Sequence, residues 1–217
     1  MRRGTETEVD VAAAAQPRKP SGRLDREAYF NAAFRILATD GFSNLTAEAL
    51  CAELDVTRGS FYHHFSGMPE FVEALMQAWE QTVAEILAGW VAMDPIEAVG
   101  NVVTVLARWP FQAEAALRAW GWSNPGVAET VRRWDLSWEA ANRAWLENVI
   151  DDPERCRVLA HMSHAVVVGM MSLQRPVDVN LVMAVMGELA RVTLGVELVP
   201  DPTGEWFVPH FTSDEPA

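Results

Sequence analysis

Apolar residues recur three or four positions apart along most of this chain, and that spacing is typical of amphipathic helices. One such pattern runs from position 24 to 40 and ends before Gly41, a residue type that commonly stops a helix. A longer pattern runs from 68 to 91 and carries Pro69 in its first turn, where proline is tolerated. No segment of the sequence keeps the alternation of a β-strand. The chain is therefore predicted to be all-α.

Five prolines divide the remainder of the sequence into further helical segments, expected near 96–108, 111–121, 125–150, 153–174 and 178–195. The chain then has four regions. We expect a flexible arm over 1–22, a small helical domain over 23–67, a larger helical domain over 68–198 and a tail over 199–217. The helix over 68–91 would extend roughly 35 Å, which is long enough to join the two domains.

Residues 46–65 contain two short helical segments around a tight turn at Asp55 and Val56. Thr46 and Thr57 stand where the N-caps of these helices are expected. Hydroxyl, arginine, tyrosine and histidine side chains follow on the second segment. This order indicates a helix-turn-helix, whose second helix reads the major groove of DNA.

Several spacings around this segment match one known family. Residues 26–42, the pair Leu45 and Thr46, and the stretch Val-Thr-Arg-Gly-Ser-Phe-Tyr-His-His-Phe at 56–65 resemble the DNA-binding domain of TetR-family transcriptional regulators. Residues 117–133 resemble a ligand-domain segment of the same family. The resemblance implies an N-terminal three-helix DNA-binding domain, joined by a long helix to a helical ligand-binding and dimerisation domain.

Side-chain chemistry predicts how the helix-turn-helix contacts DNA. The helix N-termini at Thr46 and Thr57 present N–H groups that suit phosphate. Gly59 allows close approach of the backbone, Arg58 can grip guanine O6 and N7 together, and Ser60 could touch a base edge. Phosphate or sugar contacts are expected from Tyr62, His63 and His64. Taken singly, a capping threonine or an exposed histidine pair is more often structural, so the prediction rests on their joint spacing.

The net charge of −13 opposes nucleic-acid binding. Residues 1–66 are nearly neutral, with 8 basic and 9 acidic side chains, whereas residues 67–217 hold 9 basic and 21 acidic ones. Arg58 is the only Lys or Arg between 46 and 68, and Met68 stands where the family usually has a lysine. Backbone N–H groups of the helix at 68 would substitute for that contact. We therefore expect DNA affinity to depend only weakly on salt. The arm carries Arg18, Lys19 and Arg23, which could add minor-groove contacts.

All nine tryptophans lie at or after position 79. Trp134, Trp138 and Trp145 share one face of the expected 125–150 helix, a pattern more often found in a core. Nine indoles exceed what packing requires, however, and aromatic walls suit a flat or aromatic small molecule. The sequence leaves open whether these residues line a pocket or only fill the core. The candidate ligand-binding residues are Trp79, Trp109, Trp120, Trp122, Trp134 and Trp138.

The helices expected at 153–174 and 178–195 have apolar faces broader than one packing partner needs. Ala165, Gly169 and Gly187 would permit close helix approach. In TetR relatives the corresponding helices pair across a two-fold axis, so the resemblance implies a homodimer through these two helices. A dimer would present two reading helices to an operator of two half-sites, spaced by about one DNA turn or a multiple of it.

Cys156, His161 and His164 fall on one broad helical face, but no further ligand completes a metal site at readable spacing. We expect no metal and no cofactor. Three arginines and three acids of the 125–150 helix are expected as solvated pairs, although any of these acids could instead meet a cationic ligand. They are Arg132, Arg133, Arg143, Asp135, Glu139 and Glu147.

No apolar run approaches the roughly 20 residues of a spanning helix, the N-terminus lacks the apolar segment of a secretory signal, and two cysteines give no disulfide framework. A cytoplasmic protein without membrane contact is expected. The leading hypothesis is a ligand-responsive dimeric regulator, and more specifically a repressor released by a small, largely apolar or aromatic molecule. One alternative is a helical binding or interaction protein that has lost DNA affinity. The other is a helical enzyme using a Trp-lined cavity, for which no catalytic set is readable.

Overall fold

The computed structural model describes residues 25–93, 98, 105–106, 109–195, 199–200 and 206–207. The predicted arm, most of the predicted 96–108 helix and most of the tail lie outside the described residues. The described chain is almost entirely helical, as predicted. It also contains a short antiparallel pair, β1 (Val199–Pro200) with β2 (Trp206–Phe207), which the hydropathy pattern did not indicate.

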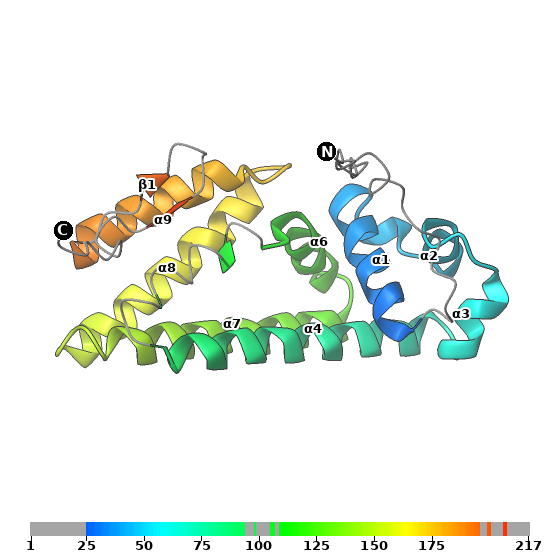
Figure 1. The fold of residues 1–217 in the computed structure, drawn as a ribbon, viewed down its shortest axis with the longest axis horizontal. Coiled ribbons are helices and arrows are strands. Elements are labelled where there is room, and N and C mark those ends of the chain that lie inside the picture. Colours follow the sequence, from blue (N-terminus) through cyan, green and yellow to red (C-terminus); the bar gives the residue numbers. More distant parts are fainter. Residues whose placement is uncertain are drawn as a thin grey trace, which may run out of the picture.

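The N-terminal helices form a compact unit at one end of the molecule (Figure 1). They are α1 (Arg26–Thr39), the 3-10 turn η2 (Phe42–Asn44), α2 (Ala47–Glu53) and α3 (Arg58–His64). The Asp25 carboxylate caps α1 by accepting from the N–H of Ala28 at 3.0 Å. Gly41 ends it with a φ of +76°, as its sequence position predicted. The turn between α2 and α3 contains Asp55 at a φ of +52°, a left-handed conformation that aspartate tolerates.

The long helix α4 (Met68–Val91) has the predicted bounds and leaves this unit along one edge of the molecule. α7 (Pro125–Leu146) runs beside it, and α6 (Phe111–Gly121) lies between α1 and the rest of the larger domain. α7 ends four residues earlier than predicted, at Leu146, before a turn at 147–149. These contacts join the N-terminal unit and the larger helical domain into one elongated molecule.

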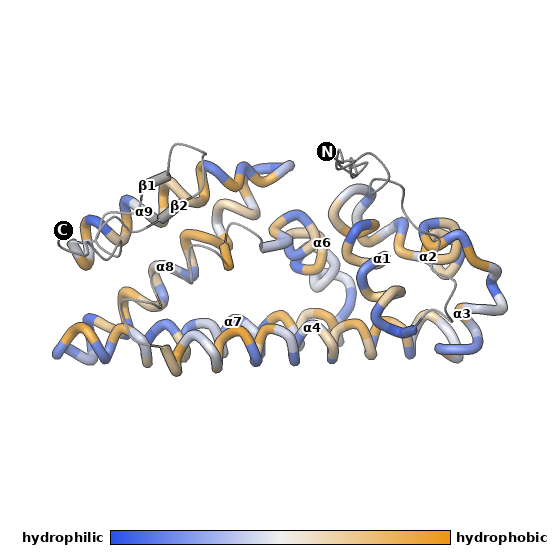
Figure 2. The backbone as a smooth tube through the Cα atoms, in the orientation of Figure 1, coloured by the Kyte–Doolittle hydropathy of each residue, from blue (hydrophilic) through white to orange (hydrophobic). Residues whose placement is uncertain are grey.

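α8 (Pro153–Leu173) crosses from the far end of α7 back toward α6, and α9 (Val179–Leu194) lies along its outer side (Figure 1). Hydrophobic positions run along both helices (Figure 2). Only Cys156, Ala160 and Met171 of α8 are buried. Much of the apolar surface of α8 is therefore not covered by the described part of the chain.

An aromatic cluster forms the core of the N-terminal unit and packs the first turns of α4 against it. Tyr29, Phe61, Phe65 and Phe71 are at most 1 % exposed. The ring of Phe71, one turn into α4, lies 5.0 Å from that of Phe65 and 5.7 Å from that of Phe61. The first turns of α4 thus belong to the N-terminal core, while its later turns pack on α7.

Candidate DNA-reading helix and tryptophan hollow

The two predicted caps of the helix-turn-helix differ in the structure. Thr46 caps α2, and its hydroxyl accepts from the N–H of Ala49 at 3.1 Å. Thr57 occupies the N-cap position of α3 but makes no capping hydrogen bond with its side chain. Its carbonyl instead accepts from the Cys51 thiol at 3.6 Å. The predicted side-chain cap at Thr57 is therefore wrong, because the turn is held through its backbone.

Arg58 is the first residue of α3 and stands at its exposed surface. Its Nη1 lies 2.8 Å from Oε1 of Glu48 on α2, in an exposed ion pair. The hydrogen bond with Tyr62 and the charge of Glu48 both raise the pKa of Arg58. Glu48 therefore competes with any DNA acceptor for this guanidinium.

Gly59 and Ser60 follow Arg58, and only Ser60 is bound to a residue of the core. A Cβ on Gly59 would meet only Oγ1 of Thr57, at 3.7 Å, so internal packing does not require glycine here. The hydroxyl of Ser60 accepts from that of buried Tyr29 at 2.8 Å. Ser60 thus joins α3 to α1, a structural role that its sequence position did not indicate.

Tyr62 is 52 % exposed on α3, and His63 is exposed as well. His64 is half-buried, with its ring 5.5 Å from that of Tyr29. The His64 carbonyl accepts from Nη1 of Arg26 at 3.3 Å, and the Arg26 guanidinium lies 4.5 Å from the centre of the Phe65 ring. The C-terminal end of α3 is thus fixed to α1, whereas Tyr62 and His63 face outward.

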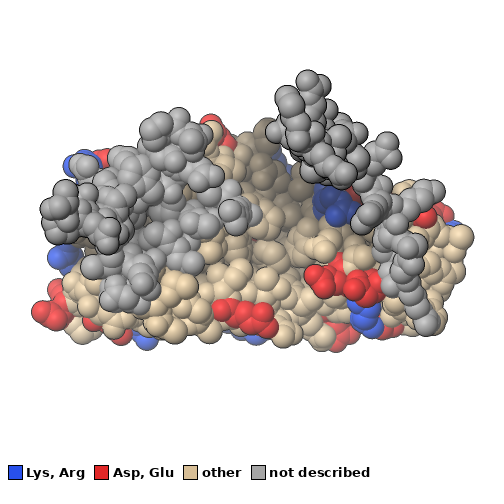
Figure 3. Space-filling model, viewed as in Figure 1, with Lys and Arg blue, Asp and Glu red and all other residues tan. Residues whose placement is uncertain are grey.

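Met68 begins α4 and packs partly into the core, away from a phosphate-binding role. The preceding residue Gly67 is the N-cap and offers no side-chain cap. The Glu70 carboxylate accepts from the N–H of Ser66 at 2.7 Å. A carboxylate therefore already stands at the N-terminus where a DNA phosphate was expected. On the face in Figure 3, Lys and Arg of the described residues appear as separate groups and not as a continuous basic surface.

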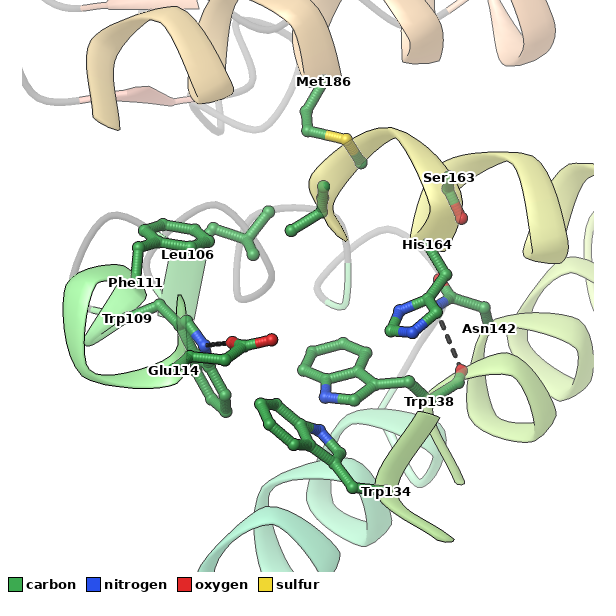
Figure 4. Close-up of a pocket in the computed structure, with 11 residues that line it drawn as sticks. Leu106, Trp109, Phe111, Glu114, Trp134, Trp138, Asn142, Ser163, His164 and Met186 are labelled. Carbon is green, nitrogen blue, oxygen red and sulfur yellow. Dashed lines mark hydrogen bonds between the residues drawn. The ribbon is translucent and has the colours of Figure 1, made fainter. Parts of the chain in front are cut away.

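A hollow lies between α6, α7, α8 and α9, and we call it the tryptophan hollow (Figure 4). It is open to solvent on one side and has a cavity volume of about 50 Å³. Three of the predicted residues, Trp109, Trp134 and Trp138, line it. The other lining residues were not predicted and are Leu106, Phe111, Glu114, Asn142, Ser163, His164, Val167 and Met186.

A chain of polar contacts forms one wall of the tryptophan hollow. Glu114 is 2 % exposed, and its carboxylate accepts from Nε1 of Trp109 at 2.5 Å and from Nε of Arg118 at 2.8 Å. Arg118 donates two further hydrogen bonds to Asp135, at 2.6 and 3.1 Å. His164 Nε2 lies 2.9 Å from the same carboxylate. Asp135 is therefore not part of a solvated pair, contrary to the prediction for α7.

The pKa values of the two acids in this network, Glu114 and Asp135, are shifted in opposite directions. Burial raises the pKa of Glu114, and the nearby Arg118 only partly opposes this effect. Burial also acts to raise the pKa of Asp135, but hydrogen bonds from His164 and Arg118 hold it below its usual value. The network thus places two carboxyl groups and one imidazole around a single guanidinium.

A second hollow adjoins the first, and we call it the aliphatic hollow. It has a cavity volume of about 90 Å³ and shares Leu106, Asn142, Ser163 and Met186 with the tryptophan hollow. Its own walls are mostly aliphatic and come from α7, α8 and α9, with two tryptophans that were not among the candidates. These walls include Trp90, Trp145, Leu146, Leu159, Met183 and Leu189.

Three of the predicted ligand residues do not line either hollow. Trp122 is 94 % exposed, just beyond the end of α6. Trp120 stacks on Phe42 at 6.0 Å, between α6 and the N-terminal unit. Trp79 is buried behind the tryptophan hollow. Indole spacing located the aromatic region but did not give the side to which each ring points.

Trp79 connects the tryptophan hollow with the N-terminal unit. Its ring lies 5.3 Å from that of Trp109 and 5.4 Å from that of Trp134, both of which line the hollow. On its other side it lies 4.8 Å from the ring of Phe34 on α1. Trp79 thus packs against two rings that line the hollow and against one ring of α1.

The three residues considered for a metal site are dispersed. Cys156 is buried and its thiol donates to the carbonyl of Ile150 at 3.5 Å. His161 pairs with Glu139 at 2.9 Å, while His164 faces Asp135. Among the described residues, no three His, Cys, Asp or Glu side chains come together as a metal site.

Residues 30–75 match the family model described as bacterial regulatory proteins, tetR family. A search of functionally curated proteins finds no match. Solved structures share the fold at low identity. A TetR transcription regulator from Haloarcula marismortui has a TM-score of 0.61 and 14 % identity, over 77 % of this chain and 96 % of its own. A transcriptional regulator from Rhodococcus sp. Rha1 has a TM-score of 0.56 and 20 % identity, over 69 % and 82 %.

A third structure, the multidrug binding protein EbrR complexed with malachite green, has a TM-score of 0.51 and 21 % identity, over 76 % of this chain and 96 % of its own. The helix-turn-helix geometry of α2 and α3 and the match over 30–75 agree with the resemblance in the sequence. Residues 30–75 thus carry a helix-turn-helix domain that matches the tetR-family model, and the chain has the all-α fold of the similar solved structures.

Proposed function

We propose that this regulator is a homodimer that binds an operator of two half-sites and is released from it by a small, largely apolar or aromatic effector. The observation that carries the proposal is the position of Trp79. The same ring contacts two walls of the tryptophan hollow and the first helix of the N-terminal unit. These contacts support a link between occupancy of the hollow and the position of the DNA-binding domain.

In this proposal the domain over 23–67 reads DNA through α3. Arg58 contacts a base edge, Tyr62 and His63 contact the backbone, and Gly59 lets α3 come close. Their exposure supports these roles. Thr46 and Thr57 contribute helix N-termini, and Ser60 and His64 hold α3 in place more than they contact DNA. Because the described contact surface offers few basic groups, we expect DNA affinity to fall only slowly with added salt.

Dimerisation through α8 and α9 is supported by their uncovered apolar side chains, which include Val158, Met162, Leu173, Leu181 and Val192. Among the described helices, α8 is the one that is long and apolar enough to cross a membrane, with 17 % of that stretch buried. The polar contacts of its His161 and His164 with Glu139 and Asp135 of α7 tie it into the helical domain. A second copy of the chain in the cytoplasm is therefore the partner that we propose for this face.

The proposed switch is a shift between two populations. An effector in the tryptophan hollow would favour the arrangement of Trp109 and Trp134 that accommodates it. Trp79 and Phe34 then carry the change to α1 and to the first turns of α4. The separation of the two reading helices moves away from the roughly 34 Å that adjacent half-sites require. EbrR binding malachite green offers a precedent for an aromatic effector on this fold.

The DNA-binding role can be tested with duplexes selected by the wild-type protein from a random pool. Arg58→Ala and Tyr62→Ala should each weaken binding at least ten-fold in a gel shift. Arg35→Ala is the matched control, because Arg35 also pairs with an α2 carboxylate, Glu53 at 2.6 Å, but lies on α1. Failure of the wild type to select any sequence would instead favour an interaction protein without DNA affinity.

A further inference from the structure

The basic side chains of the N-terminal unit are already paired with acids of the same chain. Residues 25–67 contain three arginines and no lysine. Each guanidinium lies beside a carboxylate, and the pairs are Arg58 with Glu48 at 2.8 Å, Arg35 with Glu53 at 2.6 Å and Arg26 with Glu70 at 3.6 Å. The unit that we propose to meet a polyanion therefore has its arginines matched to internal anions.

The pair of Arg58 and Glu48 lies on the surface that we propose to read DNA. Glu48 is in the first turn of α2, Arg58 is the first residue of α3, and their side chains are 72 % and 60 % exposed. An exposed ion pair contributes little to fold stability. An acid in the first turn suits the dipole of α2, but that role requires no contact with Arg58. Fold stability thus does not account for this pair.

Glu70 places a second carboxylate next to the reading helix. It accepts from the N–H of Ser66 at 2.7 Å and lies beside Arg26, which also donates to the carbonyl of His64 at the end of α3. The hydrogen bonds from Ser66, and then the charge of Arg26, lower the pKa of Glu70. Glu70 is therefore ionised at neutral pH, between the end of α3 and the start of α4.

Guanine and phosphate respond differently to such a carboxylate. Guanine is neutral, and a guanidinium has more N–H donors than its contact with Glu48 uses, so Arg58 can bind guanine while it keeps Glu48. A phosphate is an anion, and it must either displace Glu48 or lie beside a like charge. Phosphate contacts supply almost all of the affinity for non-specific DNA. The carboxylate thus weakens non-specific binding more than it weakens base reading.

We propose that Glu48 and Glu70 are internal competitors of DNA phosphate, which suppress binding to non-specific DNA and so increase the preference of this protein for its operator. The inference deepens the proposed function and rests on it, since it assigns these two acids as specificity-determining residues. Specificity gained in this way costs affinity, because the same carboxylates oppose every DNA backbone.

Fluorescence anisotropy with the full-length protein over a series of salt concentrations tests the proposal. The operator duplex selected from a random pool is compared with a scrambled duplex of the same length and composition. Glu48→Gln should raise affinity for the scrambled duplex about ten-fold or more, as for an added charge-assisted hydrogen bond. The rise for the operator should be only about two- to five-fold. On the scrambled duplex, the slope of log affinity against log salt should steepen by about 0.9 for each Arg58 that gains a phosphate.

Glu70→Gln should change both quantities in the same direction but less, because Arg26 keeps its contacts with the His64 carbonyl and the Phe65 ring. Glu53→Gln is the matched control, since it removes one charge and frees Arg35, which lies on α1 and not at the start of α3. It should leave the slope and the preference for the operator unchanged.

Equal gains in Glu48→Gln and Glu53→Gln would reduce the effect to net charge and overturn the proposal. An unchanged preference for the operator in Glu48→Gln would overturn it as well. If the wild type selects no duplex from the pool, the proposed function fails, whereas a steeper slope of Glu48→Gln on the scrambled duplex would still support competition with phosphate.

Discussion

Gly59 offers a test in which fold stability and DNA affinity should change in opposite directions. It lies in the first turn of α3, and a Cβ there meets only Oγ1 of Thr57 at 3.7 Å, an ordinary van der Waals contact. Because alanine is the better helix former, Gly59→Ala should stabilise each protomer by about 0.5–1 kcal/mol. The same methyl group would separate α3 from DNA, at a cost of about 1–3 kcal/mol, as for an extra methyl in a packed interface. A loss of operator affinity of about 5- to 150-fold is expected.

Urea unfolding at fixed protein concentration measures the first effect, and fluorescence anisotropy with a selected duplex measures the second. Gly89→Ala is the matched control. Gly89 lies within α4 and is exposed, and a Cβ added to it would have no neighbouring atom within 4 Å, so this variant should give the stability gain with unchanged DNA binding. Wild-type operator affinity in Gly59→Ala would refute the assignment of this face to DNA. A loss of stability would refute the assumed helical geometry.

Three further outcomes are expected. Glu48→Gln frees Arg58 and removes an exposed carboxylate from the reading surface, so operator affinity in anisotropy should rise about two- to five-fold, the range of an exposed ion pair, whereas Glu53→Gln should leave it unchanged. Arg118→Met removes the cation that Glu114 and Asp135 share and should lower the free energy of unfolding by about 3–5 kcal/mol at pH 7. Loss of the guanidinium raises the folded-state pKa values of Glu114 and Asp135. An acid whose folded-state pKa is raised favours the folded state at pH values below its unfolded pKa, and this contribution is lost as pH rises. The deficit against wild type in urea should thus shrink toward pH 4, and a deficit that grows on acidification would contradict the buried network. Gly169→Leu should convert dimers to monomers in sedimentation, since nothing within the protomer lies within 4 Å of that site; an unchanged dimer would place the interface elsewhere.

Hydropathy spacing predicted most helix bounds because the buried face of a helix shows as apolar residues repeated every three or four positions within the same segment. α4 and α6 begin and end where the pattern indicated. Local capping rules were less reliable at Thr57, where the turn uses backbone and the Cys51 thiol. The direction of a side chain at a helix end was the least predictable property, as exposed Trp122 shows. A difference of one residue in where the helix ends decides whether such a side chain points to solvent or to the core.

The polar wall of the tryptophan hollow was missed because its partners come from three helices. Glu114, Arg118, Asp135 and His164 are brought together only by the packing of α6, α7 and α8. One signal was present in the sequence. Glu114 and Arg118 are four residues apart and are the only charged residues of the α6 segment, which is rich in alanine. An ion pair isolated on an otherwise apolar helix indicates a buried pair more than a solvated one.

The position of Trp79 limits how this protein can acquire new effectors. Substitutions that reshape Trp109 or Trp134 also change what supports Phe34 and α1, so altered ligand choice and altered operator binding would arise together. The aliphatic hollow is less constrained, because Trp90 stands 11 residues, or about 16 Å, farther along α4. Under the proposed function, substitutions in the aliphatic hollow should therefore change ligand choice while DNA recognition is kept.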